Sequence, residues 1–341
     1  MRMRYLDASR IAADWICPRS RYWGYEFEGG GITPIEPNAD LQFGQRIAAQ
    51  VQRIRDKQPL VAAEATNEGV LEMGLLLAYT STIWPLWDAE YEVIATELEC
   101  AQPLGSALTY LARPDAVLRR RSDGTIWVLS DKTTSLPAAT FCQQWQKAVQ
   151  NHAECVLVEH QLGVTVSGYF TQGWYKGYKK ADTIYSPLAF AWCRQGATAL
   201  TKDVWLAEYK YGWPRRRIDA YPGGIAAWIR QLPAELIHAQ FPVAGPTLLR
   251  RDMVEAYLTQ VTIRDETIVD GQGQRELDIQ KQLSWLYPQH FANCDEYGKY
   301  RRPCAFRECC WVPSIGLDPL ASGLYIKRIP HHDQERLTQA N

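Results

Sequence analysis

The pattern of hydrophobic and polar positions is most informative over residues 97–135, where apolar runs alternate with polar breaks. Apolar positions over Tyr110–Arg119 and Thr125–Thr134 predict two strands, and Glu97 closes an apolar run that precedes them. The Ser122-Asp123-Gly124 step between the two strands is typical of a hairpin turn. The pattern therefore predicts a three-stranded meander.

Helical periodicity predicts helices on both sides of this meander. The expected helices lie within residues 5–28 and over residues 40–56, 61–84 and 140–161. Further strands are expected over Val164–Gly173 and Ser186–Arg194. Because strands and helices alternate, we expect an α/β fold with a central mixed sheet flanked by helices.

Two charged residues interrupt the apolar strands of the meander. Asp115 is followed by Ala116, Val117 and Leu118, and Lys132 follows a run that includes Val128 and Leu129. A carboxylate or an ammonium group in an apolar strand costs free energy unless it is paired or bound to a metal. The two residues therefore indicate either a buried ion pair or a functional site.

Composition limits the classes of protein that need to be considered. The chain has 341 residues, 46% of them hydrophobic, and a net charge of −1. No apolar run reaches the roughly 18 residues that a membrane span needs, and no signal peptide is evident, so we expect a cytoplasmic protein without membrane contact. Any DNA binding must come from local basic patches. The candidate patches are Arg119–Arg121, Arg215–Arg217, and Lys176, Lys179 and Lys180 with interleaved tyrosines.

The cysteines form a second group of candidate residues. The chain has nine, an odd number, and an intracellular chain seldom relies on disulfides. Cys294, Cys304 and Cys310 stand on one late segment, with Cys309 as a rival for the last position. Thiolates at such spacing ligate zinc or an iron–sulfur cluster. By itself Cys17 is most simply a buried structural thiol, and the remaining cysteines are expected to be inert core thiols.

The stretches ARPDAVLRR and DGTIWVLSDKTTS resemble the core of the PD-(D/E)XK nucleases, specifically the RecB-type and CRISPR-adaptation-type members that carry an iron–sulfur cluster. Glu97, Asp115 and Lys132 match three positions of the family pattern. Ser130 stands at the fourth, where the family has Asp or Glu. Asp131 is adjacent, but neighbouring side chains on a strand point to opposite faces, so only a β-bulge would bring it into the site.

This resemblance implies metal-assisted hydrolysis of phosphodiesters by Mg²⁺ or Mn²⁺. It makes Asp115 the main metal ligand, Glu97 a second or water-mediated ligand and Asp131 a substitute for the missing carboxylate, while Lys132 stabilises developing charge. Gln150 matches the first residue of a family Gln-x-x-x-Tyr motif that approaches the DNA. Two further positions depart from the family, since Glu154 replaces the motif's Tyr and Ala48 stands where related nucleases carry a histidine.

The resemblance also groups the cysteines. It implies a four-iron four-sulfur cluster held by Cys17, Cys294, Cys304 and Cys310, which would staple the two ends of the chain together. On this basis we expect a single nuclease-like domain over residues 1–341. Its core would span about residues 40–260, and a cluster subdomain would combine residues 1–30 and 285–330.

Two functions follow for this fold. The first is a metal-dependent DNA nuclease, an exonuclease or DNA-end processing enzyme in phage or mobile-element recombination or repair, with DNA and other recombination or helicase proteins as partners. The second is a catalytically degenerate subunit that binds DNA or scaffolds a complex, because Ala48, Ser130 and Glu154 all replace site residues. A third reading is a zinc-stabilised protein without a nucleic-acid role.

Overall fold

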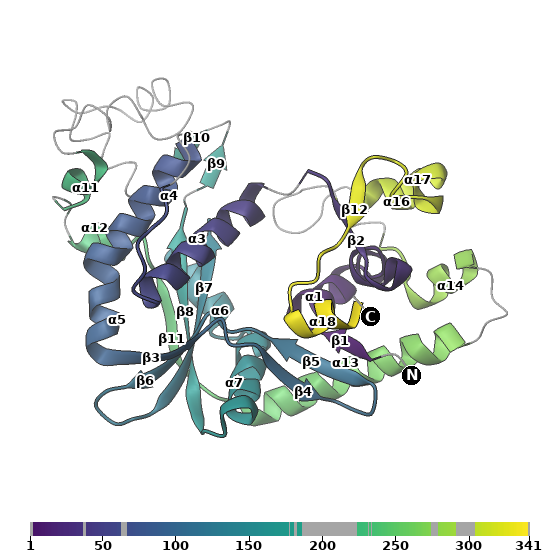
Figure 1. Ribbon diagram of the computed structural model, residues 1–341, viewed down its shortest axis with the longest axis horizontal. Helices are drawn as coiled ribbons and strands as arrows, with labels where there is room; N and C mark the ends of the chain where they lie inside the picture. Colours follow the sequence, from purple (N-terminus) through teal and green to yellow (C-terminus); the bar gives the residue numbers. More distant parts are fainter. Residues whose placement is uncertain are drawn as a thin grey trace. The chain divides into compact units, whose positions relative to one another are not determined.

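The computed structural model describes residues 3–36, 39–62, 67–176, 178–180, 183–185, 224–230, 232, 234–273, 279–290 and 304–339. The chain divides into two compact units (Figure 1). Unit 1 comprises residues 1–38, 99–113 and 251–341, and unit 2 comprises residues 39–98 and 114–250. The protein is mixed α/β, which confirms the predicted fold class at that level.

Unit 2 is built on a five-stranded mixed sheet of order β11-β8-β7-β6-β3. The parallel pair is β7 with β8, and the other neighbours are antiparallel. Its strands are β3 (Tyr91–Thr96), β6 (Ala116–Arg120), β7 (Ile126–Thr134), β8 (Val166–Tyr175) and β11 (Val243–Leu248). A parallel pair needs a crossover connection, which is supplied here by α6 (Ala138–Trp145) and α7 (Val149–Leu162).

The contacts of β7 and β8 show which helices cover each face of this sheet. Asn151 of α7 donates to Thr171, which pairs with Ser130 and so shares its face. On the other face, α3 (Ala39–Arg55) contacts Asp131, and Trp87 of α5 (Trp84–Glu90) donates to Gln172. Unit 2 therefore has three layers, with α3 and α5 on one face and α7 on the other. The apolar core of the α3/α5 face includes Tyr91, Leu118, Trp127, Leu129 and Phe170.

The remaining elements of unit 2 lie around these layers. A π-helical turn over Tyr79–Ile83 joins α4 (Asn67–Ala78) to α5. The short elements are β9 (Tyr178–Lys180), β10 (Thr183–Tyr185), α11 (Gly224–Ile229) and α12 (Ala234–His238).

Unit 1 contains two small sheets with the helices around them. One sheet has the order β1-β5-β4, with β1 (Arg4–Leu6), β4 (Cys100–Pro103) and β5 (Leu108–Ala112); the other pairs β2 (Ile32–Pro34) with β12 (Tyr325–Lys327). Its α-helices are α1 (Ala8–Ile16), α2 (Pro18–Arg21), α13 (Arg251–Gly273), α14 (Ile279–Leu286), α16 (Arg307–Trp311), α17 (Pro313–Leu317) and α18 (Asp333–Gln339). Tyr22–Glu26 forms a π-helix and Phe27–Gly29 a 3₁₀ turn.

Buried ion pairs connect the early and late segments of unit 1. Arg21 lies 2.6 Å from Asp265 of α13 and 3.1 Å from Glu26. Arg10 lies 2.8 Å from Glu335 of α18. Each of these buried charges has an opposite charge beside it, which offsets the free energy of removing a single charge from water.

The predicted meander is wrong in one respect. The expected strand Tyr110–Arg119 is divided, because β5 ends at Ala112 and β6 begins at Ala116. The two strands belong to different sheets and different units. Pro114 lies between them, and proline cannot donate a hydrogen bond to a sheet. Asp115 therefore lies in a bend immediately before β6 and not in the middle of a strand.

Two predicted helices are also divided. The expected helix 61–84 forms α4 and the π-helical turn, and α5 begins where it was expected to end. The expected helix 140–161 breaks into α6 and α7 after Trp145. The predicted strand Ser186–Arg194 lies outside the described residues. Within the described part of the chain, no helix is both long enough and apolar enough to cross a membrane.

Candidate active site

Asp115 lies at the centre of the candidate site in unit 2. Its Oδ2 accepts hydrogen bonds from the Asp131 peptide N–H at 2.7 Å and from Ser130 Oγ at 3.2 Å. The Lys132 ammonium lies 3.8 Å from the same oxygen. The side chain of Asp115 is 18% exposed, so the carboxylate remains accessible to a small ligand.

Lys132 lies on the same face of β7 as Ser130, as the alternation of side chains requires. Its Nζ donates to Ser130 Oγ at 3.1 Å and lies 5.6 Å from the centre of the Trp145 ring. Burial lowers the pKa of Lys132, but negative charges raise it further, so the net pKa is above the usual value. The charges are those of Asp115, Glu154, Asp131 and Glu97, in decreasing order of effect.

A serine beside a lysine can form a nucleophile and its base, but this lysine is unsuited to that role. A general base must lose its proton near neutral pH. Because the pKa of Lys132 is raised, the ammonium keeps its proton. The pair is therefore better suited to stabilising negative charge on a bound anion.

Glu97 follows β3 directly and has a left-handed backbone conformation with φ 47°. Its N–H donates to the carbonyl of Asp115 at 3.3 Å, so the two acidic residues are joined through the backbone. A residue other than glycine at positive φ costs free energy and is often found at functional sites. The structure thus brings together three of the residues that the sequence indicated, Glu97, Asp115 and Lys132.

Glu154 is an additional acidic residue near Lys132, at a position where the sequence analysis noted only a departure from the family motif. It lies on α7, is 5% exposed, and its Oε1 accepts a hydrogen bond from Gln150 at 2.9 Å. Its Oε2 is buried and has no hydrogen-bond partner in the described part of the chain. Burial raises the pKa of Glu154, while Lys132 lowers it. The spacing of four positions from Gln150 was the available signal, because such residues share a helix face.

Asp131 points away from this group of side chains. Its Oδ2 lies 2.5 Å from the Arg55 guanidinium, and its Oδ1 accepts a hydrogen bond from Trp174 Nε1 at 2.8 Å. The pairing of β7 with β8 is regular from Trp127 to Thr134. The β-bulge that was considered for Asp131 is therefore absent from this stretch, and the side chain stays on the opposite face from Ser130 and Lys132.

The donors near Lys132 suit a hard divalent cation. Asp115 and Glu154 are carboxylates, and Mg²⁺ is typically held by one or two carboxylates together with water and substrate oxygens. Among the described residues, no group of three or more His, Cys, Asp or Glu side chains is placed to hold a metal ion by itself. Any metal here would therefore depend on oxygens from water or from the substrate.

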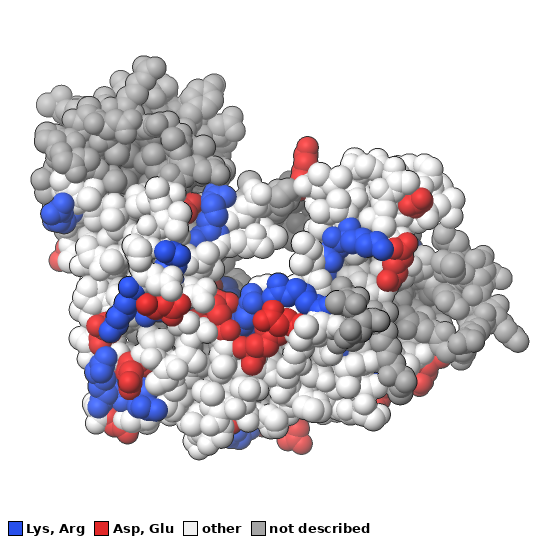
Figure 2. Space-filling view, viewed as in Figure 1, with Lys and Arg blue, Asp and Glu red and all other residues white. Residues whose placement is uncertain are grey.

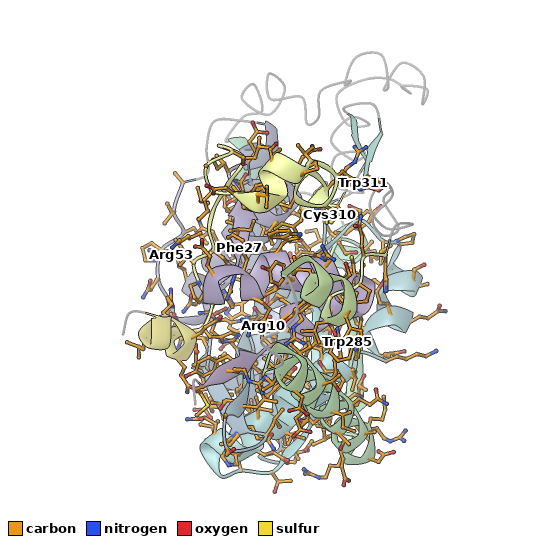
Figure 3. All side chains as sticks on the ribbon, turned by 90° about the vertical axis from the view of Figure 1, so that its right-hand side faces the viewer. Arg10, Phe27, Arg53, Trp285, Cys310 and Trp311 are labelled. Carbon is orange, nitrogen blue, oxygen red and sulfur yellow. The ribbon has the colours of Figure 1, made fainter. Side chains whose placement is uncertain are left out.

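The cysteines expected to form a cluster lie partly within the described residues. In unit 1, Cys304 and Cys310 pack against an apolar cluster that includes Trp23 and Cys309. Cys310 lies on α16 next to Trp311 (Figure 3). Cys17 is buried at the start of α2, which leads directly into the π-helix that carries Trp23. Cys294 lies outside the described residues. Among the described residues, Cys17, Cys142 and Cys309 form no disulfide.

Cys309 differs from its neighbours in chemistry. It is 5% exposed and packs with Tyr325 in the same cluster. Burial raises the pKa of its thiol to about 12, although Tyr325 lowers it. A thiol ligates metal as the thiolate, so this environment favours Cys310 over Cys309 as a ligand.

The basic patches differ in their surroundings. Arg119, Arg120 and Arg121 pair with Glu92, Glu90 and Asp88 at 3.4, 2.6 and 3.9 Å. Positive and negative side chains accordingly alternate over β3 and β6 (Figure 2). This run is neutralised and is a poor candidate for a DNA-binding patch. The Arg215–Arg217 run lies outside the described residues, as do the side chains of Lys179 and Lys180.

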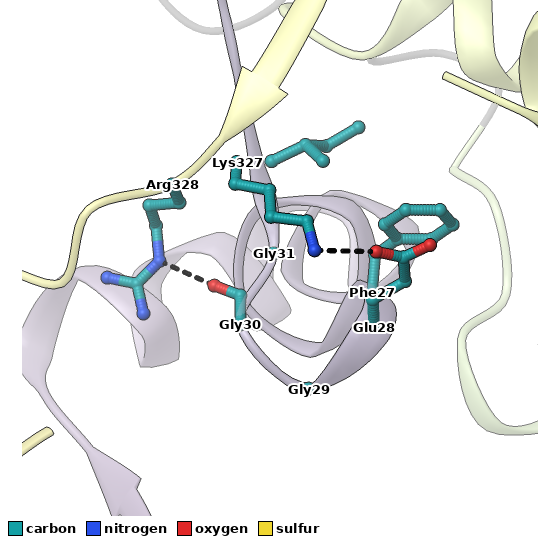
Figure 4. A pocket seen from close by; sticks show the side chains of 8 residues that line it. Phe27, Glu28, Gly29, Gly30, Gly31, Lys327 and Arg328 are labelled. Carbon is teal, nitrogen blue, oxygen red and sulfur yellow. Dashed lines mark hydrogen bonds and ion pairs between the residues drawn. The ribbon is translucent and has the colours of Figure 1, made fainter. Parts of the chain in front are cut away.

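Unit 1 also contains a cavity of about 180 Å³ beside the loop Gly29–Gly31 (Figure 4). Lys327 Nζ lies 3.4 Å from Glu28, and Arg328 Nε donates to the carbonyl of Gly30 at 3.0 Å. A Cβ atom at Gly31 would lie 2.1 Å from the carbonyl oxygen of Gly24. Glycine is therefore required at position 31, because the backbone packs too closely there for a side chain. The two cations beside the loop, Lys327 and Arg328, already have partners.

Comparison of the sequence with protein-family models finds no matching family, and comparison with curated proteins finds none of significant similarity. The assignment of a function therefore depends on the geometry around Asp115 and Lys132.

Proposed function

We propose that the protein is a metal-dependent DNA nuclease of the PD-(D/E)XK type, in which Glu154 of α7 supplies the carboxylate that β7 lacks at Ser130. The observation that carries the proposal is the position of Lys132. Its ammonium lies 3.8 Å from Asp115, hydrogen-bonds to Ser130, and is affected by the charges of Glu154 and Glu97. The mixed sheet of unit 2, flanked by helices, is compatible with this family.

Each side chain has a defined task in this proposal. Asp115 and Glu154 would hold Mg²⁺ or Mn²⁺ together with oxygens of water or substrate, Glu97 would act through a water molecule, and Gln150 would orient Glu154. A metal bound there would polarise the phosphate and lower the pKa of a water molecule. Lys132 remains protonated and stabilises the negative charge that develops on the phosphate oxygens. Ser130 hydrogen-bonds to both Lys132 and Asp115 and so fixes the position of one side chain relative to the other.

The Oε2 atom of Glu154, buried and without a hydrogen-bond partner among the described residues, supports a ligand role. A carboxylate oxygen without a hydrogen bond in a buried position is unfavourable, and burial raises the pKa of this group. A cation at the site would provide the missing partner and would favour the ionised form.

A nuclease assay with paired substitutions tests the proposal. End-labelled single-stranded and double-stranded DNA would be incubated with Mg²⁺, Mn²⁺ or chelator. We expect metal-dependent cleavage that Lys132→Ala abolishes and that Glu154→Gln lowers at least about 100-fold, following the effect of lost metal interactions. The exposed Glu92 is a control, and Glu92→Gln should cleave like the wild type.

The double variant Ser130→Asp with Glu154→Gln moves the carboxylate from the helix to the strand. Ser130 already lies within hydrogen-bonding distance of both Asp115 and Lys132. We therefore expect the double variant to recover part of the activity that Glu154→Gln loses. Cleavage by Glu154→Gln at the wild-type rate would contradict the assignment of Glu154.

The alternative is a catalytically silent relative that binds DNA or scaffolds other proteins. The presence of serine at position 130 favours it, because the strand then provides no second carboxylate. Uncut DNA under every metal condition, with a gel shift that weakens as salt rises, would support this alternative. Processing of DNA ends in recombination or repair, with helicase or recombination proteins as partners, remains part of the nuclease proposal.

We also propose that Cys17, Cys294, Cys304 and Cys310 hold a four-iron four-sulfur cluster. Support comes from Cys304 and Cys310, which both pack against the same group of buried apolar side chains around Trp23. Protein purified without oxygen should be brown and should contain iron and acid-labile sulfide. Cys310→Ser should lose both, whereas Cys155→Ser, which alters a buried thiol in unit 2, should retain them. Bound zinc without iron would favour the zinc-stabilised alternative.

A further inference from the structure

A buried ion pair lies on the face of the sheet opposite the candidate active site. Arg55, at the end of α3, has a side chain that is 1% exposed, and the Asp131 side chain is 4% exposed. Their closest atoms are 2.5 Å apart. Trp174 of β8 donates to the second oxygen of Asp131 at 2.8 Å, so both carboxylate oxygens are engaged.

This pair is connected to Asp115 by two backbone contacts. The peptide N–H of Asp131 donates to Asp115 Oδ2 at 2.7 Å. Arg55 Nη1 donates to the backbone carbonyl of Asp115 at 3.4 Å. The same carbonyl accepts the N–H of Glu97 at 3.3 Å. Arg55 and Asp131 thus complete a ring of contacts that includes the backbones of both acidic residues on the active-site face.

We propose that Arg55 and Asp131 act together as a positioning pair, which fixes Asp115 and Glu97 from the opposite face of the sheet and takes no part in metal binding. The inference rests on the proposed nuclease function and extends it. It gives Asp131, which the sequence pattern indicated as a metal ligand, a different task.

The energetics of buried ion pairs agree with a positioning role. A buried pair is often no more stabilising than apolar side chains of similar volume. Arg55 provides one guanidinium group that reaches both the Asp131 side chain and the Asp115 backbone, which an apolar pair does not offer. A displacement of catalytic groups by about 1 Å can lower turnover about 100-fold. An ion pair that holds Asp115 in position can therefore be retained for turnover even if it adds little to stability.

The test compares metal binding with turnover in four variants. Asp131→Asn removes the charge with little change of volume, and Arg55→Met with Asp131→Leu replaces the whole pair by apolar groups. Asp115→Asn removes a proposed ligand. Arg46→Met, on the same helix α3, breaks a different ion pair, with Glu72 at 2.8 Å, and is the matched control. Mn²⁺ binding to DNA-free protein would be followed by electron paramagnetic resonance, and folding by circular dichroism.

We expect the apolar double variant to fold, to bind Mn²⁺ as the wild type does, and to show a kcat about 100-fold lower with an unchanged KM for DNA. Asp131→Asn should also bind Mn²⁺, whereas Asp115→Asn should not. Arg46→Met should retain its kcat within about twofold, because it leaves the contacts among Arg55, Asp131 and Asp115 in place.

Two results would overturn the inference. Loss of Mn²⁺ binding in Asp131→Asn, equal to the loss in Asp115→Asn, would make Asp131 a ligand. A wild-type kcat in the folded double variant would make the pair purely structural. Absence of cleavage by the wild type with both metals would have another meaning, because it would overturn the proposed function and the inference with it.

Discussion

Lys132 donates a hydrogen bond to Ser130, with 3.1 Å between Nζ and Oγ. The hydroxyl in turn donates to the carboxylate of Asp115 at 3.2 Å. A neutral side chain thus connects the positive and the negative group at the position where a nuclease of the proposed type would have a second carboxylate. The hydroxyl preserves the geometry of the lysine without contributing its own charge.

Removal of this hydroxyl gives a first prediction. A hydrogen bond to a charged group contributes about 1.5–3 kcal/mol, so Ser130→Ala should lower kcat about ten- to hundredfold while the protein stays folded. Steady-state cleavage of end-labelled DNA measures the effect. Ser130→Thr retains the hydroxyl and should lose less. Equal rates for Ser130→Ala and the wild type would show that the connection is dispensable.

The backbone of Glu97 gives a second prediction. At φ 47° a non-glycine residue loses roughly 1–2 kcal/mol, part of which glycine recovers. Glu97→Gly should therefore raise the free energy of unfolding and lower nuclease activity. Lys57, with φ 56°, lies in the turn that follows α3 and is a matched control. Lys57→Gly should raise stability without loss of activity, and urea unfolding of both variants provides the comparison.

Glu154 predicts a shifted dependence of activity on pH. Burial raises its pKa, and it must be ionised to hold a metal, so activity should rise with pH above the usual range of a glutamate. The double variant with Ser130→Asp and Glu154→Gln should show its acid limb at lower pH, because the introduced carboxylate would lie beside the Lys132 ammonium. Identical pH–rate profiles would contradict the prediction.

The same shift has an effect on stability. A carboxyl with a raised folded pKa stabilises the folded state fully below its unfolded pKa, and this contribution is lost as pH rises through the folded pKa. Glu154→Gln should therefore raise the free energy of unfolding at pH 7 in metal-free protein. Chemical denaturation at pH 7 and pH 4 tests this, and the gain should shrink at the lower pH.

His331 predicts acid sensitivity in unit 1. Burial and the adjacent Arg113 lower its pKa to about 4. The unfolded chain binds this proton at a higher pH than the folded chain does. The free energy of unfolding should therefore fall as pH drops from about 6.5 to about 4, and His331 should have no effect on it above pH 6.5. His331→Gln should reduce the fall. His160→Gln, on an exposed position of α7, should leave it unchanged.

Adjacent cysteines on α16 give a prediction about thiol reactivity. Burial raises the pKa of Cys309 to about 12, so its thiolate is scarce at pH 8. In metal-free protein, pulsed alkylation with mass spectrometry should label Cys310 well before Cys309. Faster labelling of Cys309 would contradict its assignment as a structural thiol.

Local sequence signals predicted part of this architecture. The turn at Ser122-Asp123-Gly124 is present, with Gly124 at φ 73° and Asp123 accepting the N–H of Thr125. Helix α3 and the β6–β7 hairpin also follow their hydrophobic patterns. These features depend on residues that are close together in sequence, so a local sequence pattern is sufficient to predict them.

Other features depend on tertiary contacts. The division of residues 110–119 could not be read from hydrophobicity, because both halves are apolar and only their partners show that they join different sheets. The importance of Glu154 was missed because helical periodicity shows that a residue is buried, but not which charge it faces. The paired surroundings of Asp131 depend on Arg55 and Trp174, which are distant in sequence.

The hydrogen bond between Glu97 and Asp115 has a consequence for the modularity of the chain. The chain leaves unit 2 after Leu98 and re-enters it at Pro114, and the β4–β5 hairpin occupies the intervening stretch. Since the N–H of Glu97 reaches the carbonyl of Asp115 at 3.3 Å, the two ends of this insertion are already adjacent. A short turn can therefore bridge them with little loop-closure entropy. We therefore expect changes in the length of this hairpin to leave Glu97, directly after β3, and Asp115, directly before β6, in place.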